Sequence, residues 1–148
     1  MSWLINCSKC GKKTKASDIV DLISRRNKDG WFLGQCGHQG YVEKNFKTQE
    51  GSMWEPYLRG IIPLGTRGRV YQPFVFLVSN GPKKPANDIW FSYYKDLRNK
   101  KGRKKGRLKV GYGPGGPPVL DTAGVRDLLR KLAKVGRVSQ RQIADALK

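Results

Sequence analysis

Residues 70–78 read VYQPFVFLV, a run of β-branched and aromatic residues that is typical of a β-strand. In an extended chain, alternate side chains from position 74 to position 78 point to opposite sides. Both sets are apolar, so the sequence predicts a central strand that is buried on both faces. Pro73 lacks an amide hydrogen, and we expect it to mark the start of this strand.

Two neighbouring runs extend the predicted sheet. Residues 88–94 (DIWFSYY) are rich in aromatic residues and predict a second strand, and residues 57–64 predict a third. The stretch between the first two strands, residues 79–87, is rich in turn-forming residues. Its length suits an antiparallel hairpin with Lys83 and Lys84 at an exposed tip.

Aromatic side chains alternate along the second strand. Trp90 and Tyr94 fall on one side, and Phe91 and Tyr93 fall on the other. One pair should face the core, while the other can form a platform on which unpaired bases stack. We take Trp90 and Tyr94 as candidate base-binding residues. The alternative is that both pairs are buried.

A dense basic run follows at residues 95–109, which hold nine Lys or Arg and one acid. The run has no apolar period by which to fold on its own, and we expect an arm that binds phosphate. A solvated loop or a nuclear-import signal would give the same composition. The candidate phosphate-binding residues, on this arm, near the start of the first strand and at the hairpin tip, are Arg67, Arg69, Lys83, Lys84, Arg98, Lys100, Lys101, Arg103, Lys104, Lys105, Arg107 and Lys109.

The last part of the chain predicts a helical hairpin beyond a Gly/Pro-rich connector at residues 110–118. Asp121 is a candidate N-cap for a helix that stops near Gly136. Ser139 and Gln142 have the spacing of a capping box, which predicts a second helix.

Residues 138–147 (VSQRQIADAL) resemble the positioning helix of a helix-turn-helix domain. In that family the next helix enters the major groove. Here the sequence stops at Lys148, so either the recognition element is absent or the two helices form a plain hairpin. We favour the hairpin.

The three cysteines and the single histidine form two short pairs, Cys7 with Cys10 in CSKCG and Cys36 with His38 in CGH. Structural zinc sites take four thiolate or imidazole ligands, often as two pairs separated by an intervening segment. The sequence therefore predicts one zinc site. Free thiols and a disulfide are the alternatives, and a disulfide would leave one cysteine over.

The segment between the two pairs has its own predicted structure. Ser17 is a candidate N-cap for a helix over residues 18–26, and residues 31–33 predict a strand that leads to the second pair. Gly11 and Gly37 tolerate the positive φ of a tight metal-binding turn.

With these motifs, the first 48 residues resemble the zinc-ribbon and zinc-finger class of nucleic-acid-binding modules. The chain departs from the usual ribbon in its Cys-x-His pair and its internal helix. We therefore transfer no base-reading residue from that class. Lys12, Lys13 and Lys15, which follow the first pair, can extend a basic surface.

The net charge of the chain indicates which class of molecule it binds. The 148 residues include 30 Lys or Arg and 11 Asp or Glu, a formal net charge of +19. A polyanion is the natural counterpart, and nucleic acid fits best. No long apolar run and no secretory signal are apparent, so we expect no membrane association and a cytoplasmic protein, with association to a nucleoid or nucleus also open.

The sequence thus favours a non-enzymatic nucleic-acid-binding protein with a structural zinc ion and a basic phosphate-binding arm. DNA is favoured over RNA because of the helix-turn-helix-like tail. An alternative is an adaptor or inhibitor that docks on a nucleic-acid-handling complex through Trp3, Trp54 or Tyr57. A third is a metal-dependent nuclease, whose candidate acids are Glu43, Glu50, Glu55, Asp88 and Asp96.

The expected fold class is α+β. It comprises a small zinc-stapled module at residues 1–48, a β-rich segment with an antiparallel sheet and the basic arm at residues 49–113, and a helical hairpin at residues 119–148. These parts can pack as one compact unit.

Overall fold

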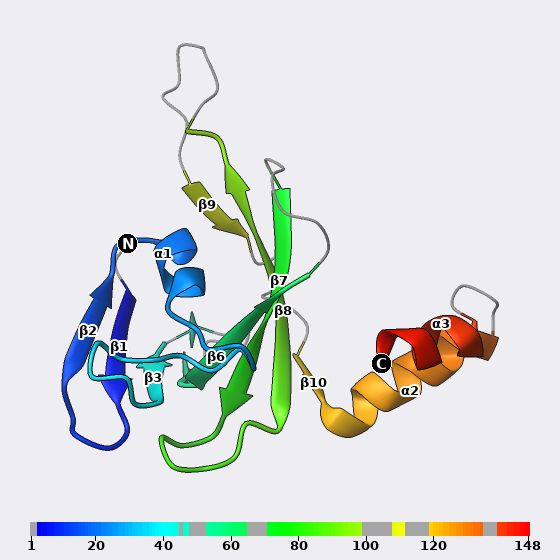
Figure 1. Cartoon of the computed structure of the whole chain (residues 1–148), viewed down its shortest axis with the longest axis horizontal. Helices are drawn as coiled ribbons and strands as arrows, with labels where there is room; N and C mark the ends of the chain where they lie inside the picture. The colour runs from blue at the N-terminus through cyan, green and yellow to red at the C-terminus, as the bar shows by residue number, and fades with distance from the viewer. Residues whose placement is uncertain are drawn as a thin grey trace.

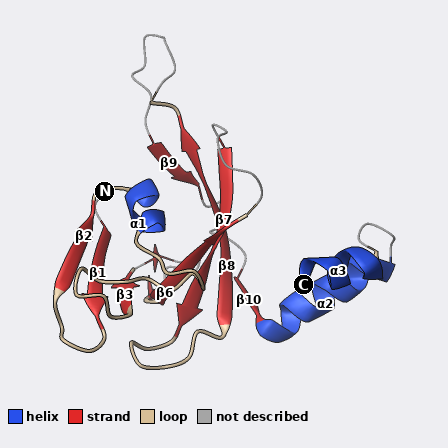
Figure 2. Cartoon of the chain, in the orientation of Figure 1, coloured by secondary structure: helices blue, strands red, loops and turns tan. Residues whose placement is uncertain are grey.

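Strands dominate the structure of this chain (Figures 1 and 2). The computed structural model describes residues 3–44, 46–47, 53–64, 71–98, 108–111, 119–134 and 139–148. Within these ranges the main sheet has eight strands, in the order β10-β8-β7-β6-β3-β1-β2, with β9 also beside β8. All of its strand pairs are antiparallel.

The elements of the main sheet are β1 (Trp3–Cys7), β2 (Lys13–Ala16), β3 (Gly40–Glu43), β6 (Tyr57–Pro63), β7 (Tyr71–Ser79), β8 (Asp88–Asp96), β9 (Leu108–Gly111) and β10 (Val119–Asp121). A small second sheet pairs β4 (Phe46–Lys47) with β5 (Met53–Trp54). The helices are α1 (Ile19–Ser24), α2 (Thr122–Lys134) and α3 (Gln140–Ala146).

The predicted central strand is confirmed as β7, which pairs with β6 on one side and with β8 on the other. Phe74 and Phe76 are fully buried, and Val75 on the opposite face is 6% exposed. The hairpin from β7 to β8 is also as predicted. Pro73 does not mark the strand start, since it lies inside β7 opposite Tyr93.

One hydrophobic core joins the N-terminal strands to the central strands. Trp3 and Ile5 of β1 belong to the same buried cluster as Phe76 of β7 and Trp90 of β8. The rings of Trp3 and Phe76 lie 5.9 Å apart, and those of Phe76 and Trp90 lie 5.7 Å apart. The segment that leads to the metal-binding loops is therefore anchored in the main core.

Helix α1 covers part of this core with the buried side chains of its apolar face, which are Ile19, Leu22 and Ile23. Its N-cap is Asp18, one residue later than we expected from the sequence. The Asp18 carboxylate accepts hydrogen bonds from the amides of Val20 and Asp21 at 2.8 and 2.9 Å. The Asp18 carboxylate therefore caps the helix, and its negative charge also interacts favourably with the positive N-terminal end of the helix dipole.

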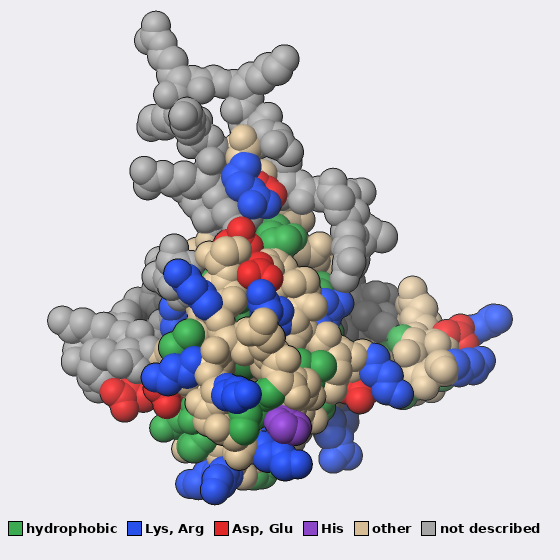
Figure 3. Space-filling view, turned by 60° about the vertical axis from the view of Figure 1, so that its left-hand side comes forward, with side chains coloured by type: hydrophobic (Ala, Val, Ile, Leu, Met, Phe, Trp, Pro, Cys, Tyr) green, Lys and Arg blue, Asp and Glu red, His purple; other side chains and the backbone are tan. Residues whose placement is uncertain are grey.

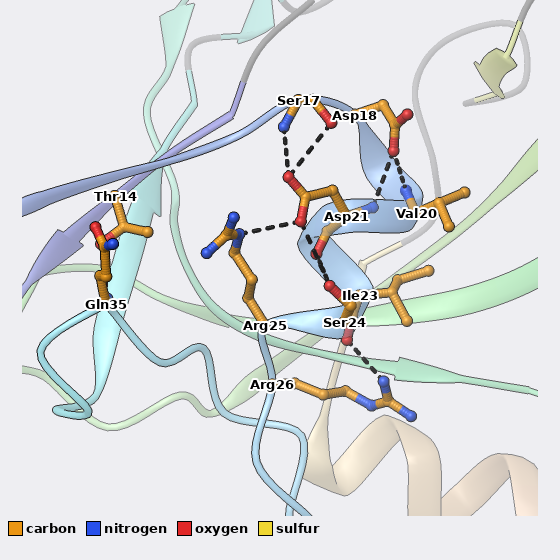
Figure 4. A network of polar contacts seen from close by, with 10 residues as sticks. All are labelled: Thr14, Ser17, Asp18, Val20, Asp21, Ile23, Ser24, Arg25, Arg26 and Gln35. Atoms are coloured by element: carbon orange, nitrogen blue, oxygen red, sulfur yellow. Dashed lines mark hydrogen bonds and ion pairs between the residues drawn. The ribbon is translucent and has the colours of Figure 1, made fainter.

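The Asp21 carboxylate fixes both ends of this short helix (Figure 4). It accepts a hydrogen bond from the Ser17 amide at 2.8 Å and one from Arg25 Nε at 3.1 Å. These two donors, the Ser17 amide first, lower the pKa of Asp21, and burial opposes them. The path of the chain into and out of α1 is thereby defined by one side chain.

The expected α+β fold class, with a small zinc-stapled module, an antiparallel sheet and a C-terminal helical hairpin, is wrong, because the described chain is mostly one antiparallel sheet. The strands next to the predicted zinc ligands, β1 and β3, do not form a separate sheet, because β3 pairs with β6 and so continues the central sheet. The long-range pairing of β3 with β6 leaves no local signal in the sequence. The predicted division at residues 48 and 113 remains a prediction.

The predicted C-terminal helical hairpin is not shown by the structure. The capping box of Ser139 and Gln142 is present, but none of the residues of α3 is buried, and Leu147 is 83% exposed. Residues 135–138, between the two helices, lie outside the described residues. The residues of α3 therefore bury no apolar stripe against another helix.

Candidate metal centre and basic surface

Four metal-binding side chains meet at one end of the sheet. Cys7 ends β1, Cys10 lies in the turn that follows, and Cys36 and His38 lie in the loop before β3. Their ligand atoms all lie within 4.8 Å of one another. A tetrahedral zinc ion with Zn–S bonds of about 2.3 Å would separate its sulfurs by about 3.8 Å. The four donors are therefore close enough to share one metal ion.

Backbone hydrogen bonds shape each ligand loop. In the first, the Cys7 amide donates to the Lys12 carbonyl at 2.9 Å, and the Gly11 amide donates to the Cys7 carbonyl at 3.2 Å. In the second, the Gly34 amide donates to the His38 carbonyl at 2.9 Å. Gly11 and Gly37 have φ of +70° and +78°, which confirms the predicted need for glycine in both turns.

Further contacts hold the two loops against each other. The Ser8 amide donates to the Gln39 carbonyl at 3.1 Å, and the Gln35 amide donates to Thr14 Oγ1 at 2.8 Å. Cys7 is opposite Gly40 in the β1–β3 register. A Cβ atom at Gly40 would lie 2.7 Å from the Asn6 carbonyl oxygen, so only glycine allows the strands to approach this closely. The protein itself thus brings the ligands together.

The cysteines are free thiols with unequal environments. The amides of Cys10 and Lys9 donate to Cys7 Sγ at 3.3 and 3.4 Å and lower the pKa of this thiol to about 6 despite its burial. The Lys12 amide lowers the pKa of Cys10, but the thiols of Cys7 and Cys36 together with desolvation outweigh it and raise the pKa overall. Thiolate is the form that binds metal, so Cys7 is already suited to that role.

A disulfide does not account for these cysteines. The closest contact, between the Sγ atoms of Cys10 and Cys36, is 3.5 Å. A disulfide bond is about 2.05 Å long. The three cysteines lie around a common centre instead.

His38 supplies an independent indication of metal binding. Its Nδ1 atom is buried and has no hydrogen-bond partner among the described residues. A buried polar nitrogen without a partner is costly, and coordination to a metal ion removes that cost. The donor set of three thiolates and one imidazole, two of them in a Cys-x2-Cys turn, suits zinc.

Exposed lysines surround the first ligand loop. Lys9, Lys12 and Lys13 are exposed, and residues 1–17 contain no Asp or Glu. In Figure 3, blue Lys and Arg side chains are spread over this view of the molecule and outnumber the red acids. With a zinc ion in place, three thiolates would outweigh its two positive charges, and these lysines would help to balance the charge of the site.

The predicted basic arm connects two paired strands. Its first residues belong to β8 and its last residues belong to β9, a strand that the sequence analysis missed. Arg98 contacts Asp96 at 2.7 Å and Asp18 at 3.4 Å, so acids already neutralise part of its charge. The predicted arm residues that lie outside the described part of the chain are Lys100, Lys101, Arg103, Lys104, Lys105 and Arg107, and the same holds for Arg67, Arg69 and the side chain of Lys109.

The other predicted nucleic-acid-binding residues differ in their exposure to solvent. Lys83 and Lys84 are exposed in the turn between β7 and β8. Arg59 of β6 holds this turn, since its Nη1 donates to the carbonyl of Pro82 at 2.6 Å. Trp90 is fully buried and cannot stack on a base, and Tyr94 is half-buried against the core. Of the two aromatic pairs, this one faces inward.

The residues named for the other two functions are not gathered into a site. Trp3 is only 3% exposed, and Tyr57 is half-buried beside Tyr41, at a ring distance of 5.5 Å. The side chain of Trp54 and the whole of Glu50 lie outside the described residues. In the ranges that the structure describes, no three acids lie close enough to share a metal ion.

Two exposed side chains escaped the sequence analysis. Lys9 lies between the first two ligands, and its place inside the CSKC motif was a usable signal. Tyr71 is 47% exposed at the start of β7. Its alternation with Pro73 and Val75 indicates the outer face, but the core side of the strand could not be assigned from the sequence.

Comparisons of the chain with protein-family models, with curated proteins and with solved structures find no match. None of the helices in the described ranges is long and apolar enough to span a bilayer. The function must therefore be inferred from the four-residue cluster and the basic surface.

Proposed function

We propose that this chain is a non-enzymatic nucleic-acid-binding protein in which a structural zinc ion fixes the two ligand loops. The observation that carries the proposal is a four-donor metal cluster whose first loop displays Lys9, Lys12 and Lys13, on a chain with a net charge of +19. Such a surface binds phosphate through counterion release and does not require a cavity.

The metal has a structural role in this proposal. Four protein ligands complete a tetrahedral shell and leave no position for a reacting water. We expect one zinc ion per chain. Substitution with Co²⁺ tests the ligand set, because cobalt bound by three thiolates and one imidazole has a characteristic absorption spectrum. A chain that binds no metal at neutral pH under reducing conditions would contradict the proposal.

The basic run at residues 95–109 is proposed to supply most of the affinity. Both of its ends are held in the sheet by the pairing of Lys95 with Lys109 in β8 and β9. The earlier preference for DNA depended on the helix-turn-helix-like tail. Because α3 has no buried residue, we propose nucleic acid as the ligand without choosing between DNA and RNA.

A salt series tests this assignment. We expect neutralisation of Lys100, Lys101, Arg103, Lys104 and Lys105 to glutamine to weaken binding and to flatten the plot of log K against log salt. The slope of this plot is negative. Each lost phosphate contact should reduce its magnitude by about 0.9 on duplex DNA or about 0.7 on a single strand.

A matched control removes the same number of charges from the C-terminal helices. Glutamine at Arg126, Arg130, Lys134, Arg141 and Lys148 changes the net charge equally. Equal slopes for the two variants would mean that total charge, and not the arm, determines affinity. Weak binding of the wild-type protein to every nucleic acid, lost by physiological salt, would refute the proposed function.

A further inference from the structure

The outer face of the central strands carries two neighbouring tyrosines that the core does not use. The rings of Tyr71 in β7 and Tyr93 in β8 lie 5.0 Å apart with an interplanar angle of 35°. Tyr71 is 47% exposed. Buried aromatic pairs are common in cores, but a half-exposed pair on an open strand face offers its rings to a ligand.

Cations lie in register with these rings. Tyr71 is the cross-strand partner of Lys95, and Lys95 is the partner of Lys109, so the three positions form one row across β7, β8 and β9. Lys95 is exposed, and its Nζ lies 5.8 Å from the centre of the Tyr93 ring. Directly opposite residues in a sheet lie about 5 Å apart, so the single charge of Lys95 lies near both rings.

Small residues occupy the positions opposite Tyr93 on both neighbouring strands. In the next row the partners of Tyr93 are Pro73 on β7 and Gly111 on β9. Gly111 has no side chain, so this position of β9 places only backbone atoms next to Tyr93. Neither partner of Tyr93 carries a large side chain, and the neighbouring Tyr71 is exposed.

We infer that this tyrosine face, made of Tyr71, Tyr93 and Lys95, binds unpaired bases of a single-stranded nucleic acid. The inference rests on the proposed function and adds the strandedness of the ligand and the place where its bases stack. A base that stacks on Tyr71 brings its own phosphate within reach of Lys95, so one nucleotide satisfies both groups. Bases inside a duplex already stack on each other and cannot offer a free face to a ring.

Charge complementarity selects this occupant over an apolar protein segment. Lys95 beside the rings and a net charge of +19 favour a polyanion. The chain also continues from the tyrosine face directly into the basic run at residues 95–109.

The test measures fluorescence anisotropy with a labelled single strand of about 15 nucleotides, long enough for known stacking sites, and with a hairpin duplex of the same composition. We expect Tyr71→Leu to weaken single-strand binding by about 5- to 150-fold, the range for losing one stacked base, and to leave duplex binding unchanged. Tyr71→Trp should retain single-strand affinity.

The Trp variant also gives a direct readout. The fluorescence of a tryptophan at position 71 should be quenched when the single strand binds. This change is measured as the difference in tryptophan fluorescence between the variant and the wild-type protein. Tyr57→Leu is the matched control, because Tyr57 also belongs to a tyrosine pair but lies at the opposite end of the β6–β7 ladder. Its single-strand affinity should equal that of the wild type.

The outcomes separate the two proposals. No binding of the wild-type protein to either probe would refute the proposed function. Equal binding of the wild type to both probes, with no effect of Tyr71→Leu, would overturn the tyrosine face alone. Equal losses in Tyr71→Leu and Tyr57→Leu would also overturn it, since the effect would then not be local.

Discussion

At the scale of single residues, His38 is the most informative side chain of the candidate metal centre. Cysteine thiols tolerate burial without a partner, whereas an imidazole nitrogen does not. The Nδ1 atom of His38 is buried without a hydrogen-bond partner among the described residues, which makes it a candidate metal ligand atom. The loop backbone helps to position His38, since Gly37 before it has a φ of +78° and the His38 carbonyl accepts a hydrogen bond from the Gly34 amide at 2.9 Å.

Substitution of His38 separates coordination from packing. We expect His38→Cys to bind one zinc ion, since four thiolates also form a complete structural shell. His38→Ala should lose zinc or bind it at least about tenfold more weakly. Metal analysis after gel filtration measures both. Retention of full zinc affinity by His38→Ala would show that the histidine is not a ligand.

The composition of the ligand set could be predicted from the sequence because the chain contains only three cysteines and one histidine. The contacts that hold the ligand loops together could not. Thr14 Oγ1 accepts a hydrogen bond from the amide of Gln35, which is 21 residues away in the sequence. Neither residue type predicts that contact. The sequence also did not indicate the importance of Gly40, because glycine is required there only by the close approach of the Asn6 backbone on another strand.

At the scale of elements, α1 shows how a six-residue helix can be held in place. Isolated helices of this length are unstable in water. Here the N-cap Asp18, the Asp21 carboxylate and three buried apolar side chains compensate. The polar network therefore contributes to the position of α1 over the core as well as to its formation.

The Asp21 network should make stability depend on pH. We expect Asp21→Asn to lower the free energy of unfolding by about 1 kcal/mol at neutral pH, because it weakens the bonds from the Ser17 amide and Arg25. The pKa of Asp21 is lowered in the folded state, so its stabilising effect is present above the ordinary Asp range and is lost as pH falls through the lowered pKa.

Urea unfolding at several pH values measures this difference. The wild type and Asp21→Asn should converge in acid, whereas Asp29→Asn, at an exposed turn position, should match the wild type throughout. A constant gap between wild type and Asp21→Asn down to acid pH would exclude the ionised carboxylate as the cause.

Elements with strong local patterns were predicted well from the sequence, and weak ones were missed. β7 and β8 carry dense β-branched and aromatic residues, and both were expected. β9 was missed because Leu108–Gly111 contains two apolar residues at the end of a basic run. Its pairing with β8 comes from the neighbouring strand, and Val110 packs against a core that only the folded chain contains.

At the scale of the whole molecule, the continuous sheet couples the metal centre to the core. Trp3 and Ile5 are buried in the cluster that contains Phe76 and Trp90, and β1 ends at the ligand Cys7. Loss of order at the ligand loops would therefore expose core residues of β1. An independent zinc module would unfold by itself, whereas this arrangement predicts that the two regions unfold together.

Chelation should therefore shift one cooperative transition. Free zinc at 1,000 times its Kd stabilises a fold by about 4 kcal/mol, which corresponds to a Tm change of about 10 °C for a chain of this size. We expect tryptophan fluorescence and far-UV circular dichroism to report a single Tm, lowered by that amount in chelator. Cys10→Ser, which alters an exposed ligand, should have the low Tm with or without chelator.

Two separate transitions in the chelator-treated protein would contradict this coupling. So would a Tm that chelator leaves unchanged in the zinc-loaded wild type.

One end of the sheet has a further consequence, for solubility. β2 is the last strand in the sheet order, so its outer backbone groups are not paired within the described sheet. Such an edge can template the addition of another copy of the chain and lead to aggregation. β2 alternates buried Thr14 and Ala16 with exposed Lys13 and Lys15. Two lysines on a four-residue edge repel an identical strand, and so the charges that suit a polyanionic ligand also keep neighbouring copies apart.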